Sequence, residues 1–210
     1  MTATALDQAL FHTTQKSMES QPAKSPRAAR IIVTGGTFDK HYDEIKGELT
    51  FKNSHLPMIL AQSRVTLPIE LEINQLIDSL QMQDEHRERV LASCRSASEE
   101  CIVVIHGTDT MADTARVVGN AGLAKTIVFT GAMIPYAVQG SDALFNLGFA
   151  LAASEMLPAN TYVAMNGRTF AWNRVRKKQN GRGIRGNRLT CVLIDTQRRP
   201  RLRDKFLVPQ

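Results

Sequence analysis

Apolar runs alternate with segments of helical periodicity over most of the chain. Short runs that are apolar throughout are typical of strands buried on both faces of a sheet, and strict alternation is typical of strands with one exposed face. These patterns predict strands at Ile31–Thr34, Ile69–Ile73, Cys101–Ile105, Thr126–Thr130 and Thr161–Met165. Helices are predicted at Leu56–Gln62, from Asp84 to about Arg95, from Met111 to about Gly119, and after a capping Asp142 through Ala152. Alternating strands and helices imply an α/β fold with a doubly wound, mostly parallel sheet.

Two polar segments flank the first predicted strand. Residues 1–29 are rich in Thr, Ser, Gln and Ala and contain Pro22 and Pro26, so we expect a flexible N-terminal extension. The stretch 39–51 is charged and contains Gly47. It predicts a mobile hairpin or lid that follows the first strand.

The regular pattern ends after Phe170. Residues 173–188 are basic and glycine-rich, and only Leu189–Ile194 has the composition of a further strand. We therefore expect one α/β domain over residues 30–178. Residues 179–210 are expected to form a basic C-terminal tail that is poorly ordered or not native to the domain, for example after a frame shift.

The distribution of charge argues against a nucleic-acid-binding domain. The net charge is +6, but residues 174–205 hold twelve Lys or Arg and two acidic residues, a local charge of +10. The rest of the chain therefore carries a charge of −4, the difference between +6 and +10. The basic segment lacks interleaved aromatic residues of the kind that single-strand binders use. We expect no specific nucleic-acid partner.

The cysteines and the apolar runs favour a cytoplasmic protein that has no contact with membranes. Three cysteines are present, Cys94, Cys101 and Cys191, without the spacing of a metal site. Reduced thiols in the cytoplasm are the simpler interpretation. No apolar run approaches the roughly 20 residues of a transmembrane helix, and the polar N-terminus does not resemble a signal peptide.

The candidate chemistry lies in two turns that each follow a predicted strand. One is Thr34-Gly35-Gly36-Thr37, and the other is His106-Gly107-Thr108-Asp109-Thr110-Met111. Such turns meet at the carboxyl ends of parallel strands, where open α/β sheets bind their ligands. A threonine hydroxyl becomes a nucleophile when a base activates it, and backbone N–H groups beside glycine can stabilise an oxyanion.

Two alternatives to a catalytic site are open at this stage. Glycines also make tight turns, and threonine and aspartate also cap helices, so either turn alone is as well explained by structure. A phosphate-binding loop is a third reading, but neither the dinucleotide pattern nor the Gly-Lys-Ser/Thr pattern is present.

Taken together, the turns resemble the two active-site motifs of the bacterial L-asparaginase/glutaminase family in sequence, order and separation. Gly131-Ala132-Met133-Ile134-Pro135 resembles the third strand-end loop of the family, and residues 142–147 resemble the helix that follows it. The resemblance covers about residues 30–178. It implies a flavodoxin-like three-layer domain, the N-terminal asparaginase domain, without the C-terminal domain that most members add.

The resemblance also implies amide hydrolysis without a cofactor or a metal. Thr37 matches the nucleophilic threonine, and Tyr42 matches the lid tyrosine that helps to activate it. Thr108 and Asp109 match a hydroxyl and a carboxylate that act with a lysine, for which Lys177 fits best and Lys178 remains an alternative. The substrate-binding residues implied are Gly36, Ser79, Gly107, Asp109 and Ala132, whereas His106 is expected to be structural.

Three departures from the family pattern bear on the expected activity. Phe38-Asp39 replaces a small apolar pair, and Leu80 stands where many members have a glutamine that contacts the substrate. No residue after Phe170 matches the acidic residue that the C-terminal domain supplies to a neighbouring subunit. Asp39, Asp43 or Glu44 of the lid would have to replace it, and we expect weaker substrate binding than in two-domain members.

The function predicted is hydrolysis of L-asparagine to L-aspartate and ammonia by a cytoplasmic homo-oligomer. A glutaminase-asparaginase of broader specificity and an amidotransferase component acting on a charged tRNA are alternatives within the family. A non-catalytic amino-acid-binding module is an alternative of a different class.

Overall fold

A single six-stranded sheet organises the domain. The computed structural model describes residues 27–177 and 184–186, with the backbone alone at 176–177 and 184–186. The sheet order is β4-β1-β5-β6-β7-β8, with β1 Ala29–Gly35, β4 Ile69–Ile77, β5 Cys101–Ile105, β6 Thr126–Thr130, β7 Asn160–Met165 and β8 Arg168–Ala171. Only β8 is antiparallel to its neighbour. The predicted doubly wound, mostly parallel α/β sheet is confirmed.

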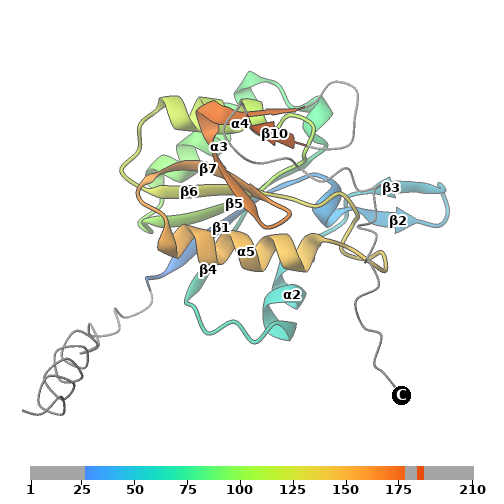
Figure 1. Cartoon of the computed structure of the whole chain (residues 1–210). Coiled ribbons are helices and arrows are strands. Elements are labelled where there is room, and N and C mark those ends of the chain that lie inside the picture. Colours follow the sequence, from blue (N-terminus) through green and yellow to red (C-terminus); the bar gives the residue numbers. More distant parts are fainter. Residues whose placement is uncertain (1–26, 178–183, 187–210) are drawn as a thin grey trace, which may run out of the picture.

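Helices cover both faces of this sheet and make it the middle of three layers (Figure 1). They are α2 Leu56–Gln62, α3 Asp84–Ser96, α4 Met111–Asn120 and α5 Ala143–Met156. On one face Ile32, Val104 and Phe129 pack with Val90 of α3 and Val118 of α4. On the other face Ile31, Val33, Val103 and Val128 pack with Ile59 of α2 and Leu147 of α5. Side chains of one strand alternate between the two cores because successive residues point to opposite faces.

The charged stretch after β1 forms the predicted hairpin. Its strands are β2, His41–Asp43, and β3, Glu48–Thr50, and they pair antiparallel. The hairpin extends away from the three layers (Figure 1). In its turn Asp43 Oδ1 accepts hydrogen bonds from the backbone N–H groups of Ile45 and Lys46. The hydrogen bond from Lys46, and to a lesser extent that from Ile45, lowers the pKa of the Asp43 carboxyl.

Two predicted strands are longer in the structure. β1 begins at Ala29, two residues before Ile31, and β4 continues past Ile73 to Ile77. The extension of β4 was not predicted because the adjacent polar residues Asn74 and Gln75 interrupt the alternation of apolar and polar positions. Their amides donate to the Ser93 hydroxyl, at 2.9 Å, and to the His86 carbonyl, at 3.1 Å. Residues of α3 therefore accept hydrogen bonds from the side-chain N–H groups of these two polar residues of β4.

Three strands were not predicted. β8 follows β7 through the two-residue turn Asn166-Gly167, whose φ angles are +53° and +74°. β9, Val175–Lys177, pairs antiparallel with β10, Ile184–Gly186, within the segment for which no regular pattern was found. The strand predicted at 189–194 lies outside the described residues, as does most of the predicted N-terminal extension.

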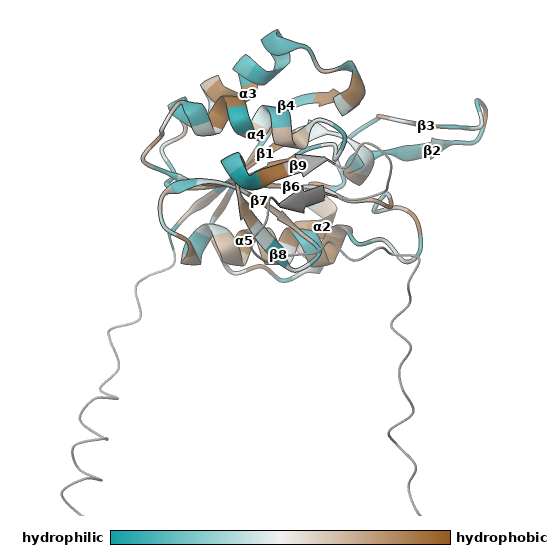
Figure 2. Ribbon diagram, turned by 45° about the horizontal axis from the view of Figure 1, so that its top comes forward, coloured by the Kyte–Doolittle hydropathy of each residue, from teal (hydrophilic) through white to brown (hydrophobic). Residues whose placement is uncertain are grey.

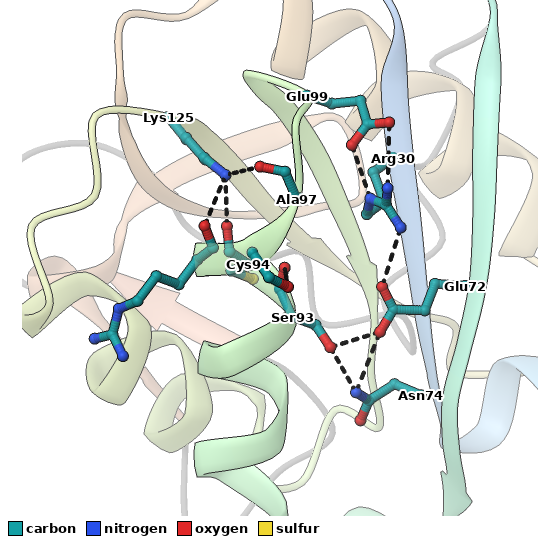
Figure 3. A network of polar contacts seen from close by, with 10 residues as sticks. Arg30, Glu72, Asn74, Ser93, Cys94, Ala97, Glu99 and Lys125 are labelled. Carbon is teal, nitrogen blue, oxygen red and sulfur yellow. Dashed lines mark hydrogen bonds and ion pairs between the residues drawn. The ribbon is translucent and has the colours of Figure 1, made fainter.

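A polar network joins β1, β4 and α3 near the amino ends of the strands (Figure 3). The guanidinium of Arg30 pairs with Glu99 at 2.8 Å and with Glu72 at 3.3 Å. Glu72 in turn accepts a hydrogen bond from the Ser93 hydroxyl at 2.5 Å. Nearby, the Lys125 ammonium donates to three carbonyl oxygens at the carboxyl end of α3. This part of the molecule is held by charge-assisted hydrogen bonds.

Cys94 and Cys101, the cysteines of the described residues, form no disulfide and are fully buried. Burial raises the pKa of the Cys94 thiol to about 12, so this thiol is unreactive at neutral pH.

Hydrophilic residues lie along much of α3, in contrast with the pale and brown strands of the sheet (Figure 2). No helix among residues 27–177 or 184–186 is long and apolar enough to cross a membrane.

Candidate active site

The two candidate turns lie side by side at the carboxyl edge of the sheet. β1 and β5 are adjacent and parallel, and Val33 pairs with Ile105 at their carboxyl ends. The chain leaves β1 for β4 on one side and returns to β5 on the other side, which makes this position a topological switch point. Ligands of open α/β sheets bind at such a point. The turns that follow β1 and β5 both open toward it.

Backbone contact between the turns depends on glycine. Gly36 has a φ of +77°, a conformation that favours glycine. A Cβ atom on Gly36 would overlap the nitrogen and Cα of Gly107. The Gly36 N–H also donates to the Ile77 carbonyl of β4 at 3.2 Å. Gly36 is therefore placed where the ends of three strands converge.

Ser79 joins the same cluster from the single turn η2, Ser79–Gln81, that follows β4. A Cβ atom on Gly107 would lie 2.6 Å from the Cβ of Ser79. The Thr110 hydroxyl donates to the Ser79 carbonyl at 2.8 Å. The Ser79 side chain is 1% exposed, and its hydroxyl has no hydrogen-bond partner among the described residues. The structure therefore brings Gly36, Gly107 and Ser79 together.

The threonines of the two turns differ in environment. Thr37 begins the single turn η1, Thr37–Asp39, and is half-buried. Thr108 is 9% exposed, and Asp109 is half-buried beside it. Thr34, by contrast, is fully buried, and its hydroxyl donates to the Ile105 carbonyl at 2.8 Å. Thr34 fastens β1 to β5, whereas Thr37 retains partial access to solvent.

His106 is held as a neutral imidazole at the end of β5. Its Nδ1 lies 2.8 Å from the Gly107 carbonyl oxygen, so this nitrogen carries the proton and donates. Its Nε2 lies 2.8 Å from the Thr114 hydroxyl of α4 and accepts from it. Complete burial lowers the pKa of His106 to about 4, and the hydrogen bond to Gly107 opposes this shift. Both ring nitrogens are occupied, as a structural histidine requires.

The loop after β6 completes this edge. A Cβ atom on Gly131 would overlap the His106 carbonyl oxygen, and Ala132 is 1% exposed. Asp142 was predicted to cap the following helix, and it occupies the N-cap position of α5, although its carboxylate makes no cap hydrogen bond. It accepts instead from the backbone N–H groups of Met133 and Ile134 at 3.0 Å, because the loop folds back over the start of α5.

Asn146 is a residue of this site that sequence reasoning missed. It is fully buried in α5. Its amide group donates to the Gly131 carbonyl and to the Asp142 carboxylate, each at 2.9 Å. Its carbonyl oxygen accepts from the backbone of Asn166 in the β7–β8 turn. An asparagine on an otherwise apolar helix face was the available signal.

The structure does not bring Tyr42 into the cluster, and it leaves the position of the Lys177 side chain undescribed. Tyr42 lies in β2 of the hairpin with 64% of its surface exposed. Lys177 is the last residue of β9, but its side chain lies outside the described part of the structure, as does all of Lys178. Of the suggested replacement acids, Asp43 is committed to the hairpin turn and Glu44 is exposed.

Asp39 and Lys40 anchor the Thr37 turn in ways that the sequence did not reveal. Asp39 is fully buried, and its carboxylate accepts from the backbone N–H of His55 at 2.8 Å. The Lys40 ammonium pairs with the Asp78 carboxylate, just before Ser79, at 2.5 Å. Two adjacent charged residues after Thr37 were the only signal. Among the described residues, no group of three or more His, Cys, Asp or Glu is placed to hold a metal ion.

A family profile described as "Asparaginase, N-terminal" matches residues 29–183. The chain belongs to the asparaginase family. The match begins with β1 and includes every turn of the cluster, so the asparaginase fold predicted from the two motifs is confirmed.

Two similar proteins are each longer than the segment that this chain matches. L-asparaginase 1 of Escherichia coli (strain K12) is 30% identical over 174 residues, which are 79% of this chain and 47% of the relative. A glutamyl-tRNA(Gln) amidotransferase component of Aeropyrum pernix is 32% identical over 158 residues, or 71% of this chain and 36% of that protein. The chain thus spans half or less of the length of these relatives.

A solved asparaginase structure agrees with the fold. L-asparaginase I from Vibrio cholerae O1 superposes with a TM-score of 0.70 at 24% sequence identity, over 79% of this chain and 53% of that structure. Likeness at this identity shows the shared sheet and helices.

Proposed function

We propose that this asparaginase-family chain hydrolyses the side-chain amide of L-asparagine, with Thr37 as the nucleophile. The observation that carries the proposal is the contact between Gly36 and Gly107. It sets the Thr37 hydroxyl and the Thr108-Asp109 pair on adjacent turns, so that one small substrate can reach both. A hydroxyl beside a second hydroxyl and a carboxylate is a chemistry suited to acyl transfer.

The reaction proceeds in two balanced steps. The Thr37 oxygen attacks the amide carbon and loses its proton, the carbon–nitrogen bond breaks, and the nitrogen leaves as ammonia with that proton. Water then attacks the resulting ester, releases L-aspartate and returns the proton to the Thr37 oxygen. Backbone N–H groups beside Gly36 and Gly107 are suited to the oxyanion of each step. In this proposal Asp109 binds the α-amino group, and Ser79 binds the α-carboxylate.

The base that accepts the Thr37 proton belongs to the same proposal. We propose Tyr42 as this base, reached when the hairpin bends toward the cluster, and Lys177, whose side chain lies outside the described structure, as the alternative. A lysine that is partly desolvated loses its proton more readily and becomes a competent base.

Ammonia release from L-asparagine tests the proposal. Thr37→Ala should lower kcat by roughly a thousandfold or more, as loss of a nucleophile does. Thr37→Ser retains a hydroxyl and should retain measurable turnover. Asp109→Asn should raise KM, whereas the matched change Asp113→Asn, at an exposed residue of α4 that pairs with Arg116, should leave KM unchanged. Undiminished turnover by Thr37→Ala would refute the assignment.

The similarity to an amidotransferase component favours one second candidate, a chain that acts on glutamine or on a glutamyl group. The same assay separates the two, since L-glutamine turnover above L-asparagine turnover would support the second. Binding of L-asparagine in calorimetry without ammonia release would instead indicate a non-catalytic amino-acid-binding module.

We also propose a cytoplasmic homo-oligomer, as the family resemblance implies. The two cysteines of the described residues form no disulfide, which is compatible with a reducing compartment. Light scattering after size-exclusion chromatography measures the mass in solution, and a monomer at micromolar concentration would contradict the oligomer.

A further inference from the structure

Asp39 is a buried carboxylate two residues after Thr37. The two residues belong to the same turn, in which the Lys40 N–H donates to the Thr37 carbonyl and the Asp39 N–H donates to the Gly36 carbonyl, each at 3.3 Å. The Asp39 side chain has no exposed surface. A buried charge is costly unless it is paired and hydrogen-bonded. The neighbours of Asp39 must therefore offset the free-energy cost of burying its carboxylate.

His55, at the start of α2, provides the contacts to Asp39. Its backbone N–H donates to Asp39 Oδ1 at 2.8 Å. Its ring Nδ1 lies 3.6 Å from the same oxygen, which is too long for a hydrogen bond. Neither His55 Nδ1 nor Asp39 Oδ2 has a hydrogen-bond partner among the described residues. A small approach of the ring would form an Nδ1–H to carboxylate hydrogen bond and satisfy the buried donor.

The same imidazole is stacked on the hairpin. The rings of His55 and His41 are parallel within 20°, with centroids 3.8 Å apart. His41 lies in β2 directly before Tyr42, and its Nε2 is 2.8 Å from the Asn53 carbonyl. A displacement of β2 therefore moves His41 against His55, and His55 is bonded to the turn that carries Thr37.

Among the residues that the structure describes, three titratable groups face the His55 ring. They are Asp39 from η1, His41 from β2, and Tyr136 from the loop after β6, whose ring centroid lies 5.3 Å away. Burial and the neighbouring His41 lower the pKa of His55, and the Asp39 carboxylate opposes this shift. At neutral pH His55 is thus uncharged, and protonation at lower pH would draw its ring toward Asp39 and set it against His41.

We propose that Asp39 is a positioning residue for Thr37: held by His55, it fixes the turn that carries the Thr37 hydroxyl and couples that turn to the hairpin through the His55–His41 stack. As a role in catalysis this rests on the proposed amidase function. The coupling itself is a structural property that can be measured without turnover.

The first experiment uses nuclear magnetic resonance of the full chain with labelled threonine methyl groups and histidine rings. The Thr37 methyl shift should change with pH at the midpoint of the His55 ring. In His55→Phe, which retains an aromatic ring against His41 and the backbone N–H to Asp39, this change should disappear. Asp113→Asn, on α4, should leave it intact. A Thr37 methyl shift that is independent of the His55 titration would overturn the proposal.

The second experiment measures kcat and KM. Asp39→Ala should lower kcat by about 10- to 100-fold, because a displacement near 1 Å costs this much, while KM changes less than about threefold. Asp39→Asn retains an oxygen acceptor for the His55 N–H and should recover most of kcat. Equal kcat values for Asp39→Ala and the wild type would overturn the proposal. If Asp39→Ala does not fold, the resonance data on His55→Phe decide. A coupled Thr37 methyl in a chain that releases no ammonia would support the positioning and refute the amidase.

Discussion

Gly119 of α4 lies against the indole ring of Trp172, so that a Cβ atom on Gly119 would fall among the ring carbons. Trp172 begins the short turn η3, Trp172–Arg174, which leads directly into β9 and its last residue Lys177. α4 in turn begins directly after the Thr108-Asp109-Thr110 turn. The contact therefore packs η3, which precedes the predicted catalytic Lys177, against α4. α4 in turn follows the predicted substrate-binding Asp109.

Gly119→Ala should destabilise the protein by about 1–3 kcal/mol, because the added methyl group overpacks the contact with Trp172. Gly148 of α5 is the matched control, since a Cβ atom there meets no atom within 4 Å. Gly148→Ala should stabilise by up to about 1 kcal/mol, the gain in helix propensity. Urea unfolding monitored by fluorescence of the single tryptophan measures both. Equal effects of the two changes would contradict the packing described.

Gly36→Ala tests the contact between the two turns. Gly36 and Gly47 both have positive φ, +77° and +68°, but a Cβ atom meets the Gly107 backbone only at Gly36. Gly47→Ala should cost about 1–2 kcal/mol from backbone conformation alone. Gly36→Ala should cost about 1–3 kcal/mol more and lower ammonia release strongly. The difference between the two midpoints of denaturation isolates the close approach, and its absence would show that the turns can separate freely.

Ser79→Ala separates binding from stability. The Ser79 hydroxyl is buried without a hydrogen-bond partner among the described residues, so its removal should change the free energy of unfolding little or raise it by up to about 1 kcal/mol. If Ser79 binds the α-carboxylate, KM for L-asparagine should rise about tenfold, equivalent to about 1.4 kcal/mol.

Ser93→Ala is the opposite case and serves as the control. It breaks the hydrogen bonds to Glu72 and Asn74, so stability should fall by about 1 kcal/mol while KM stays constant. An unchanged KM for Ser79→Ala would remove Ser79 from the binding site.

His106 should make stability fall as the pH falls. Its pKa is lowered from 6.5 to about 4 in the folded chain, so between these values the unfolded chain binds the proton and the native chain does not. The stabilisation is complete above pH 6.5 and is lost toward pH 4, by at most about 3 kcal/mol. Denaturation midpoints of the wild type and His106→Gln should converge as the pH is lowered. Parallel pH dependences would show that His106 does not titrate as described.

The strands buried on both faces were predicted from sequence with the bounds observed. Cys101–Ile105 and Thr126–Thr130 are buried at every position, and their only polar residues are the two threonines that begin and end the second strand. The end of β4 was missed because Asn74 and Gln75 interrupt the apolar pattern, and no local pattern reveals that their amide N–H groups donate to residues of α3. β8 was missed although Asn166-Gly167 is a strong signal for a two-residue hairpin.

The candidate site was predictable as far as the parallel sheet brings strand ends together. Proximity of the Thr37 and Thr108-Asp109 turns follows from adjacent parallel strands, and the family match covers both. The hydrogen bond from the His55 backbone N–H to the buried Asp39 carboxylate was not predictable. The two residues lie on either side of the hairpin, and no local sequence pattern links them. The roles of all the predicted catalytic and substrate-binding residues, Tyr42 and Lys177 included, stay predictions.

The Arg30 network shown in Figure 3 implies that the two ends of the sheet serve different purposes, stability at one end and the candidate site at the other. Charged groups fasten the amino ends of the strands, where Arg30 joins β1 to β4 and to the start of β5. The carboxyl ends are joined by glycine contacts, by buried hydroxyls and by the Lys40–Asp78 pair beside Ser79. Selection for a new amide substrate could therefore alter one end of the domain while the other continues to supply stability, and thermostabilising changes belong at the Arg30 end.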